Sequence, residues 1–223
     1  MSLLSIDLGT RSMGFALLQI SPFAIQRVGI VDLGTNVVHE AVDALHKMLT
    51  PGGDLESCIA SPDLHIVMEL QPVNSAGKCV AAALQMFALC HRIPVATMPA
   101  NRKLHLCEPW YAQCDHNVRA DSKLLSLALA DVLLNAYDKQ AAAHFAKQHY
   151  KQRTDIADAL VQGAQWIQEQ KLGDFASLFE NRPLPADLFR RNQAQQVQDA
   201  HPDEFATHPS KKRHLDEILS SFA

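Results

Sequence analysis

Three short apolar segments follow one another closely at the start of the chain, and this spacing constrains the fold more than any other feature. They cover residues 3–7, 13–20 and 25–33, and turn-forming residues separate them. Short apolar runs bounded by turn residues are typical of β-strands. Three such runs in close succession predict an antiparallel meander.

The next part of the chain alternates between helical and strand patterns. Residues 38–49 carry apolar side chains at helical spacing, and a Thr-Pro-Gly-Gly turn ends this pattern. Residues 64–69 and 94–98 have the pattern of buried strands, and an alanine-rich helix pattern over residues 75–90 lies between them. Strand, helix and strand in this order predict a parallel crossover.

Two amphipathic helices are predicted after an irregular segment over residues 101–119. They cover residues 121–137 and about 154–170. Together, the patterns predict an α/β fold with a mixed five-stranded sheet, three antiparallel strands followed by two parallel ones, and helices on both faces.

The C-terminal part of the chain has a different character. Beyond Gly173 the apolar density falls, and several prolines interrupt any periodicity. We therefore expect one domain over residues 1–171 and a partly irregular C-terminal extension over residues 172–223.

The composition is that of a soluble protein with a packed core. Of the 223 residues, 48% are hydrophobic and 20% are charged, which excludes collagen-like, coiled-coil and wholly disordered chains. Because the formal net charge is −4, a polyanionic partner would have to bind a local basic patch. No apolar run reaches the roughly 18 residues of a membrane span, so we expect an intracellular protein without a membrane partner.

The cysteines do not form a recognisable framework. There are five, without a C-x-x-C pair, which favours reduced thiols over disulfides. His105, Cys107, Cys114 and His116 are of the types that bind zinc, but their spacing matches no common zinc module. The sequence leaves open whether this cluster binds a metal.

Four acids stand where they could converge. Asp7 ends the first predicted strand, Glu69 ends the fourth, and Asp155 and Asp158 lie three residues apart in the first turn of the last predicted helix. Clustered carboxylates repel one another unless a cation lies among them, and such hard oxygen ligands favour Mg²⁺ or Mn²⁺. Taken singly, Asp7 could equally form a turn, and the two later aspartates could favour a helix N-terminus.

Three motifs resemble those of the RNase H-like nucleases, and they occur in the same order. SIDLGTRSMGFALL resembles the opening D-x-G-x-x-x-x-G hairpin, VMELQP the strand-ending glutamate, and KQRTDIADALVQGAQW the final K-x-x-x-D-x-x-D-A-L helix. The resemblance covers about residues 1–170. It is to Holliday junction resolvases of the RuvC superfamily, nearest to the poxvirus-type and fungal mitochondrial enzymes.

The first motif alone also looks like the phosphate loop of the actin and heat-shock chaperone ATPases. Those ATPases need a second phosphate loop and a glycine-rich adenosine motif within a much longer chain, and neither motif occurs in this sequence. An ATPase is therefore only the third interpretation, and absence of nucleotide binding would dispose of it.

The resemblance implies an RNase H-like fold and assigns roles to individual residues. It makes Asp7, Glu69, Asp155 and Asp158 the catalytic metal ligands and Lys103 a catalytic lysine beside them. The residues expected to contact DNA are Lys103, Lys123, Lys147, Lys151, Arg153 and Gln71. From the turn pattern, Gly9 and Gly14 are expected to supply positive φ and close strand approach in the first hairpin.

The expected function is that of a Mg²⁺-dependent endodeoxyribonuclease that resolves four-way DNA junctions in recombination and repair. A homodimer would make paired symmetric nicks by two-metal-ion hydrolysis, with Mn²⁺ as a substitute for Mg²⁺. Two alternatives stay open: a related nuclease acting on another nucleic acid, such as in RNA processing, and a catalytically silent nucleic-acid-binding protein. The sequence does not distinguish a nucleus, a mitochondrion and a viral replication site.

Overall fold

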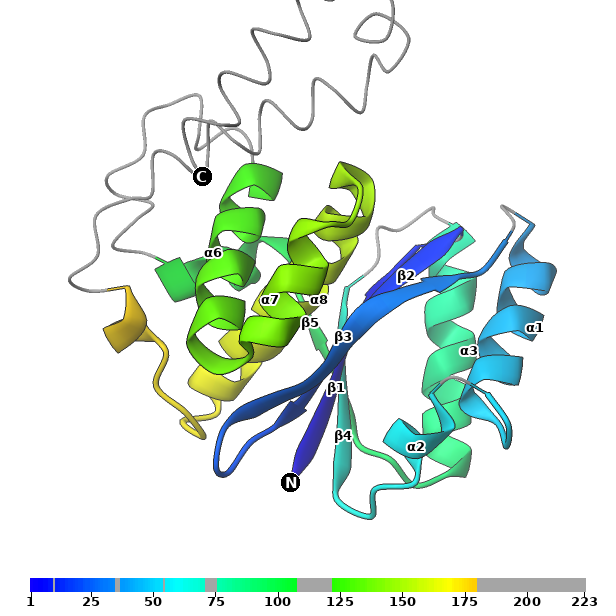
Figure 1. Cartoon of the computed structure of the whole chain (residues 1–223). Helices are drawn as coiled ribbons and strands as arrows, with labels where there is room; N and C mark the ends of the chain where they lie inside the picture. The colour runs from blue at the N-terminus through cyan, green and yellow to red at the C-terminus, as the bar shows by residue number, and fades with distance from the viewer. Residues whose placement is uncertain (10, 35–36, 54, 71–75, 108–121, 180–223) are drawn as a thin grey trace, which may run out of the picture.

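A five-stranded mixed sheet forms the centre of the computed structural model, which describes residues 1–9, 11–34, 37–53, 55–70, 76–107 and 122–179 (Figure 1). Strands β1 (Ser2–Leu8), β2 (Ser12–Gln19) and β3 (Ala24–Asp32) form an antiparallel meander. Strands β4 (Leu64–Glu69) and β5 (Val95–Met98) continue the sheet in parallel with β1, in the order β3-β2-β1-β4-β5. The predicted arrangement of three antiparallel and two parallel strands is confirmed.

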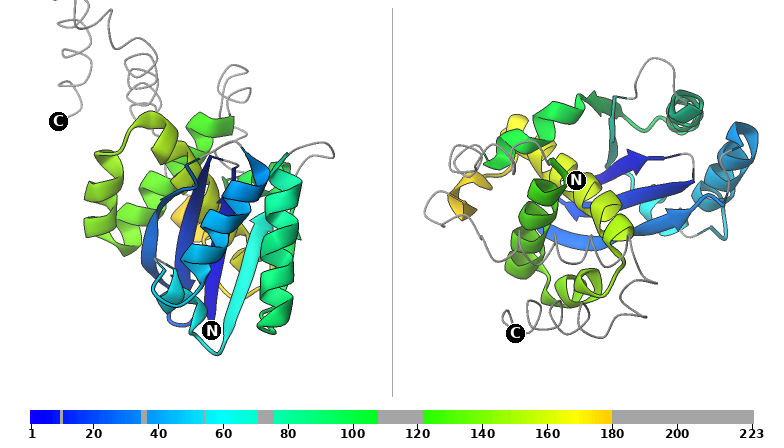
Figure 2. Two further views of the ribbon diagram at one scale, coloured as in Figure 1. Left: turned by 90° about the vertical axis from the view of Figure 1, so that its right-hand side faces the viewer. Right: turned by 90° about the horizontal axis from the view of Figure 1, so that it is seen from above.

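Helices cover both faces of this sheet, as Figures 1 and 2 show. One face carries α1 (Val38–Leu49), α2 (Glu56–Ile59) and α3 (Ala76–Cys90). The other carries the 3₁₀ helix η1 (Ala100–Cys107), α6 (Ser122–Tyr137), α7 (Lys139–Ala146), α8 (Tyr150–Glu169) and the short 3₁₀ helix η2 (Ala176–Leu178). In the described part of the chain, no helix is long and apolar enough to cross a membrane.

The alternation of side chains along β1 divides the core into two clusters. Leu4, Ile6 and Leu8 pack in the cluster under α1 and α3, whereas Leu3 packs in the cluster under α6 and α8. Because successive side chains of a strand point to opposite faces, Asp7 lies on the face of α8. The same alternation in β4 places Val67 in the α8 cluster and Glu69 on that face.

The last helix begins earlier than its sequence pattern predicts. Helix α8 starts at Tyr150 rather than near Thr154, so Asp155 lies inside the helix and not in its first turn. The apolar pattern does not extend to the first turn of α8, because Arg153 and Thr154 are polar although their side chains are buried.

Two α-helices of the described residues were not predicted from the sequence, and neither was the 3₁₀ helix η1, which lies mostly in the segment predicted to be irregular. One is the single turn of α2, and the other is α7. The carboxylate of Asp138 caps α7 by accepting hydrogen bonds from the backbone N–H groups of Gln140 and Ala141, at 3.0 and 2.9 Å.

The packed core extends past residue 171. Phe175 and Phe179 are fully buried in the α8 cluster, and the Phe175 ring meets the Phe23 ring edge to face, with 4.6 Å between centroids. The division between domain and extension stays a prediction, and residues 180–223 lie outside the described part.

Candidate active site

Strand pairing brings the acids of β1 and β4 to the same edge of the sheet. Ile6 pairs with Met68 in the parallel ladder, so Asp7 and Glu69 are the next residues along the two strands. Asp7 also pairs with Gly14 of β2, and Glu69 pairs with Met98 of β5. Two of the four predicted ligands therefore lie on neighbouring strands and on one face.

Helix α8 packs directly on this face and adds the other two acids. A Cβ atom at Gly14 would overlap the carbonyl oxygen of Asp155, so only a glycine lets the helix backbone lie so close to β2. The Ser12 hydroxyl donates a hydrogen bond of 3.0 Å to Asp155 Oδ2. Ser12 was not predicted as a site residue, although it lies within the first motif.

Lys103 joins the acids of the sheet to those of the helix. Its Nζ lies 3.1 Å from Glu69 Oε2 and 3.0 Å from Asp158 Oδ2, and its side chain is only 10% exposed. The 3₁₀ helix η1, which follows β5 directly, carries Lys103 to this position. The structure therefore brings Lys103 together with Glu69 and Asp158.

The cluster alters the acid–base properties of its members. Burial, followed by the nearby charge of Asp158, raises the pKa of Asp7 to about 7, while the charge of Lys103 partly opposes this rise. Burial also raises the pKa of Asp155, against the Ser12 hydrogen bond and the charges of Lys151 and Lys123. Although burial lowers the pKa of Lys103, the carboxylates of Asp158 and Glu69 outweigh it and raise that pKa, so Lys103 stays an ammonium ion.

The chemistry of these residues fits a hard divalent cation. Asp158 Oδ1 is buried, and none of the described residues gives it a hydrogen bond. A buried carboxylate oxygen without a partner is costly, and a cation would satisfy it. Within the described ranges, however, no three Asp, Glu, His or Cys residues are already arranged to hold a metal ion. The Lys103 ammonium lies between Glu69 and Asp158 instead.

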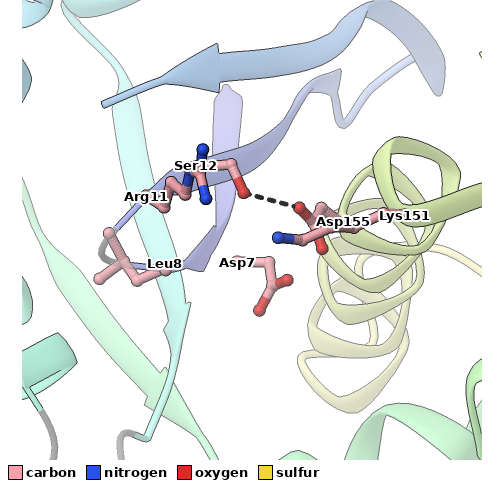
Figure 3. A pocket seen from close by; sticks show the side chains of 7 residues that line it. Asp7, Leu8, Arg11, Ser12, Lys151 and Asp155 are labelled. Atoms are coloured by element: carbon pink, nitrogen blue, oxygen red, sulfur yellow. Dashed lines mark hydrogen bonds between the residues drawn. The ribbon is translucent and has the colours of Figure 1, made fainter. Parts of the chain in front are cut away.

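Asp7 lines an open pocket of about 370 Å³, whose lining side chains Figure 3 shows. Its lining includes Asp7 from β1, Ser12 from β2, and Lys151 and Asp155 from α8. A second pocket of about 180 Å³ adjoins it and reaches Ile30 and Asp32 of β3; the two share Arg11, Ser12, Lys151 and Asp155. The exposed cations Arg11 and Lys151 thus lie along one continuous groove. Sequence reasoning missed Arg11, although it too lies within the first motif.

Three predicted DNA-contacting lysines lie on the surface. Lys151 lines the groove, and Lys123 is exposed and near enough for its charge to lower the pKa of Asp155. Lys147 is exposed at the C-terminal end of α7, and the structure does not place it in the groove. Gln71 lies outside the described residues.

Arg153, also predicted to contact DNA, is buried in the structure. Its side chain is only 4% exposed and forms an ion pair of 3.4 Å with Asp131 of α6. Its guanidinium also lies over the ring of Phe145, 4.9 Å from the centroid. The structure therefore places the Arg153 side chain in the protein interior and not in the groove, and its DNA contact stays a prediction.

The two glycines of the first hairpin act differently from the prediction. Neither Gly9 nor Gly14 has a positive φ. A Cβ atom at Gly9 would overlap the carbonyl oxygen of Ser12, to which the Gly9 N–H donates a hydrogen bond of 3.1 Å. Gly14 allows close approach of helix α8, whereas the prediction was close approach between strands.

The possible zinc cluster cannot be assembled from the described residues. His105 is exposed on η1, while Cys114 and His116 lie outside the described ranges and the side chain of Cys107 is not described. Metal binding by this cluster stays an open prediction.

Comparisons with known proteins establish the fold. No protein-family model matches the chain, and no curated protein matches its sequence. Among solved structures, fowlpox virus resolvase in complex with Holliday junction DNA is similar, with a TM-score of 0.55, 16% identity, and coverage of 76% of this chain and 99% of that chain. RuvC of T. thermophilus in complex with a Holliday junction substrate is similar with a TM-score of 0.54, 14% identity, and coverage of 78% and 97%. The predicted RNase H-like α/β fold is thereby confirmed.

Proposed function

We propose that this chain is a Mg²⁺-dependent endonuclease that resolves four-way DNA junctions. The observation that carries this proposal is the convergence of Asp7, Glu69, Asp155 and Asp158 from β1, β4 and α8. Two solved structures with this fold, at low identity, are those of fowlpox virus resolvase with Holliday junction DNA and of RuvC with a Holliday junction substrate. They support the substrate class, and the acids support hydrolytic nuclease chemistry.

The four acids would hold the divalent cations, Mg²⁺ or Mn²⁺. When bound, the cations would supply the positive charge that favours ionisation of an attacking water and stabilises the leaving 3′ oxygen. The carboxylates would fix the positions of the cations, and the hydrogen bond from Ser12 holds the Asp155 carboxylate in place. Bound cations would neutralise Glu69 and Asp158 in place of Lys103. The Lys103 ammonium could then lie beside the reacting phosphate.

The groove beside Asp7 would take the DNA backbone. Lys151 and Arg11 line it, and their side chains would bind phosphates next to the scissile one. Lys123 would extend this basic surface near Asp155. We keep Lys147, which is exposed at the end of α7, and Gln71, which lies outside the described residues, as further proposed DNA contacts.

The active form would be a homodimer. A four-way junction needs two symmetry-related nicks, and a two-fold axis presents two identical sites to two strands. Helix α3 exposes Met86 and Leu89, which are 59% and 69% accessible, and an exposed apolar helix face favours an interface with a second copy.

The test is cleavage of a labelled four-way junction with Mg²⁺ or Mn²⁺, beside linear duplex and an RNA–DNA hybrid. Asp7→Asn is the matched control, because it removes one ligand charge at nearly constant size. We expect paired symmetric nicks on the junction alone. In the variant we expect cleavage to fall more than about 100-fold, which exceeds the usual effect of residues that only support a metal ligand, while junction binding is kept.

Other outcomes would favour the alternatives. Cutting of the hybrid would identify a nuclease of the same fold with another substrate. Binding of the junction without cleavage by the wild-type protein would favour a catalytically silent binding role. Loss of both binding and cleavage in a folded Asp7→Asn variant would contradict the assignment of Asp7 as a metal ligand.

A further inference from the structure

A buried glutamine of α8 bonds to both strands that carry the catalytic acids. Gln162 is 2% exposed, and its Nε2 lies 3.2 Å from the Ile6 carbonyl oxygen and 3.3 Å from the Val67 carbonyl oxygen. The same nitrogen lies 3.2 Å from Ser5 Oγ. One side-chain amide therefore connects β1 to β4.

This connection lies near the end of the ladder between β1 and β4, next to the catalytic acids. The ladder between β1 and β4 runs from the pair Ser2–Leu64 to the pair Ile6–Met68. Beyond that pair, Asp7 is held by β2 and Glu69 by β5. Gln162 binds the carbonyl group directly before Asp7, so it ties the two strands at the end of their shared ladder.

The same residue also relates the strands to Asp158. Gln162 follows Asp158 by four positions, so the two side chains lie on one face of α8. The next residue, Gly163, permits the close approach, because a Cβ atom there would lie 2.9 Å from Ser5 Cβ and 2.7 Å from Leu18 Cδ1. The amide of Gln162 thus connects the three elements that carry Asp7, Glu69 and Asp158.

We propose that Gln162 is a positioning residue that sets the separation of the Asp7, Glu69 and Asp158 carboxylates. The proposal rests on the proposed function, because the consequence of correct spacing is a tight fit around a divalent cation. Groups that orient metal ligands change metal affinity without touching the metal. Gln162 would act in this way through the two backbone carbonyls and not through a contact with substrate.

The test compares Gln162→Met with Gln165→Met. Both glutamines are buried in α8, at 2% and 3% exposure, but Gln165 donates its hydrogen bond to Glu169 of the same helix and does not bridge the strands. Methionine keeps the volume nearly constant and removes the amide. Gln165→Met therefore reproduces the cost of losing a buried amide without the loss of the connection between strands.

Mn²⁺ binding is measured by electron paramagnetic resonance on the full-length chain, and the midpoint of thermal unfolding is measured with the metal chelated. We expect Gln162→Met to weaken Mn²⁺ binding by about tenfold or more, and Gln165→Met to change it by less than about twofold. Gln162→Asn is the second variant, because its shorter amide keeps a buried polar group without reaching both strands. If Gln162→Met does not fold, we expect the same weakening in Gln162→Asn.

The outcomes separate this proposal from the proposed function. Wild-type Mn²⁺ affinity in a folded Gln162→Met or Gln162→Asn variant would overturn the positioning role alone. Equal weakening in Gln165→Met would also overturn it, because loss of stability would then explain the effect. Failure of the wild-type protein to bind Mn²⁺ would overturn the metal-dependent function itself.

Discussion

At the scale of single residues, the fold changes the chemistry of Asp7 most. Its carboxyl is buried between β1 and α8 and shares its surroundings with Asp158, Glu69 and Asp155, which raises its pKa to about 7. In the metal-free protein, the raised pKa favours the protonated form of this acid more than an ordinary aspartate would at the same pH. A bound cation would reverse the balance, because positive charge favours the carboxylate.

The raised pKa predicts how the stability of the metal-free protein changes with pH. The ordinary pKa of an aspartate is 3.8, and that of Asp7 in the folded protein is about 7. Between these values the folded protein holds a proton that the unfolded chain has released, so the free energy of unfolding falls as the pH rises. Asp7 would contribute a slope of at most about 1.4 kcal/mol per pH unit. Urea unfolding with the metal chelated, at several pH values across this window, measures it.

The control for this prediction is Asp7→Asn, which cannot release the proton. We expect its free energy of unfolding to depend less on pH than that of the wild type, and Mg²⁺ to stabilise the wild type most at high pH. Identical pH dependence in the two proteins would contradict the assigned pKa.

Substitutions of two neighbouring cations of α8 are predicted to affect different properties, DNA binding for Lys151 and stability for Arg153. Lys151 is exposed in the groove, so Lys151→Gln should leave stability almost unchanged and reduce the slope of log affinity for DNA against log salt by about one. Arg153 is buried against Asp131, so Arg153→Gln should cost about 3–5 kcal/mol of unfolding free energy. Salt-dependent DNA binding and urea unfolding measure the two effects. If Arg153→Gln reduced the salt dependence of DNA binding and Lys151→Gln did not, Arg153 and not Lys151 would be the DNA contact.

At the scale of elements, the contact between α8 and β2 determines whether the site forms. Gly14 pairs with Asp7 on one side and lies against the Asp155 backbone on the other. A single small residue therefore sets the distance between a strand acid and a helix acid. Ser12, two residues earlier, then orients the Asp155 carboxylate.

Gly14→Ala is predicted to separate these elements. The added methyl group would overlap the Asp155 carbonyl, so α8 must move, at a cost of about 1–3 kcal/mol and with loss of cleavage. The control is Gly29→Ala on β3, where the added methyl group would lie 3.0 Å from a ring carbon of Phe15, a side chain that can shift. Urea unfolding and junction cleavage compare the two variants. Full activity in Gly14→Ala would show that cleavage does not depend on the close contact between α8 and β2.

At the scale of the whole molecule, the two sheet faces have different roles. The α8 face holds the acids, and the opposite face is covered by α1 and α3, with Met86 and Leu89 of α3 exposed. An interface on α3 would leave the groove of each copy open to DNA.

The homodimer prediction is tested by Met86→Glu combined with Leu89→Lys. The two charges should weaken self-association at least about tenfold, because buried apolar anchors dominate interface energies. Analytical ultracentrifugation measures the change, and paired nicks should become single nicks. Leu172→Lys is the control, since Leu172 is 42% exposed and follows α8. A wild-type protein that stays monomeric with and without junction DNA would contradict the dimer.

The sequence by itself determined the strands and most α-helices, because these depend on apolar periodicity, and its local motifs predicted Asp7, Glu69, Asp155 and Asp158 as the acids of the site. Only the tertiary structure decided which polar side chains are buried and with what partners. Ser12 and Asp155 are 143 positions apart, and Gln162 and Ser5 are 157 positions apart. The apolar periodicity indicates which positions face the core, but it does not indicate which distant polar residues form hydrogen bonds with one another. For the same reason, the sequence does not reveal that Arg153 is buried, or that Gln162, on the same helical face as Asp155 and Asp158, bonds to both strands.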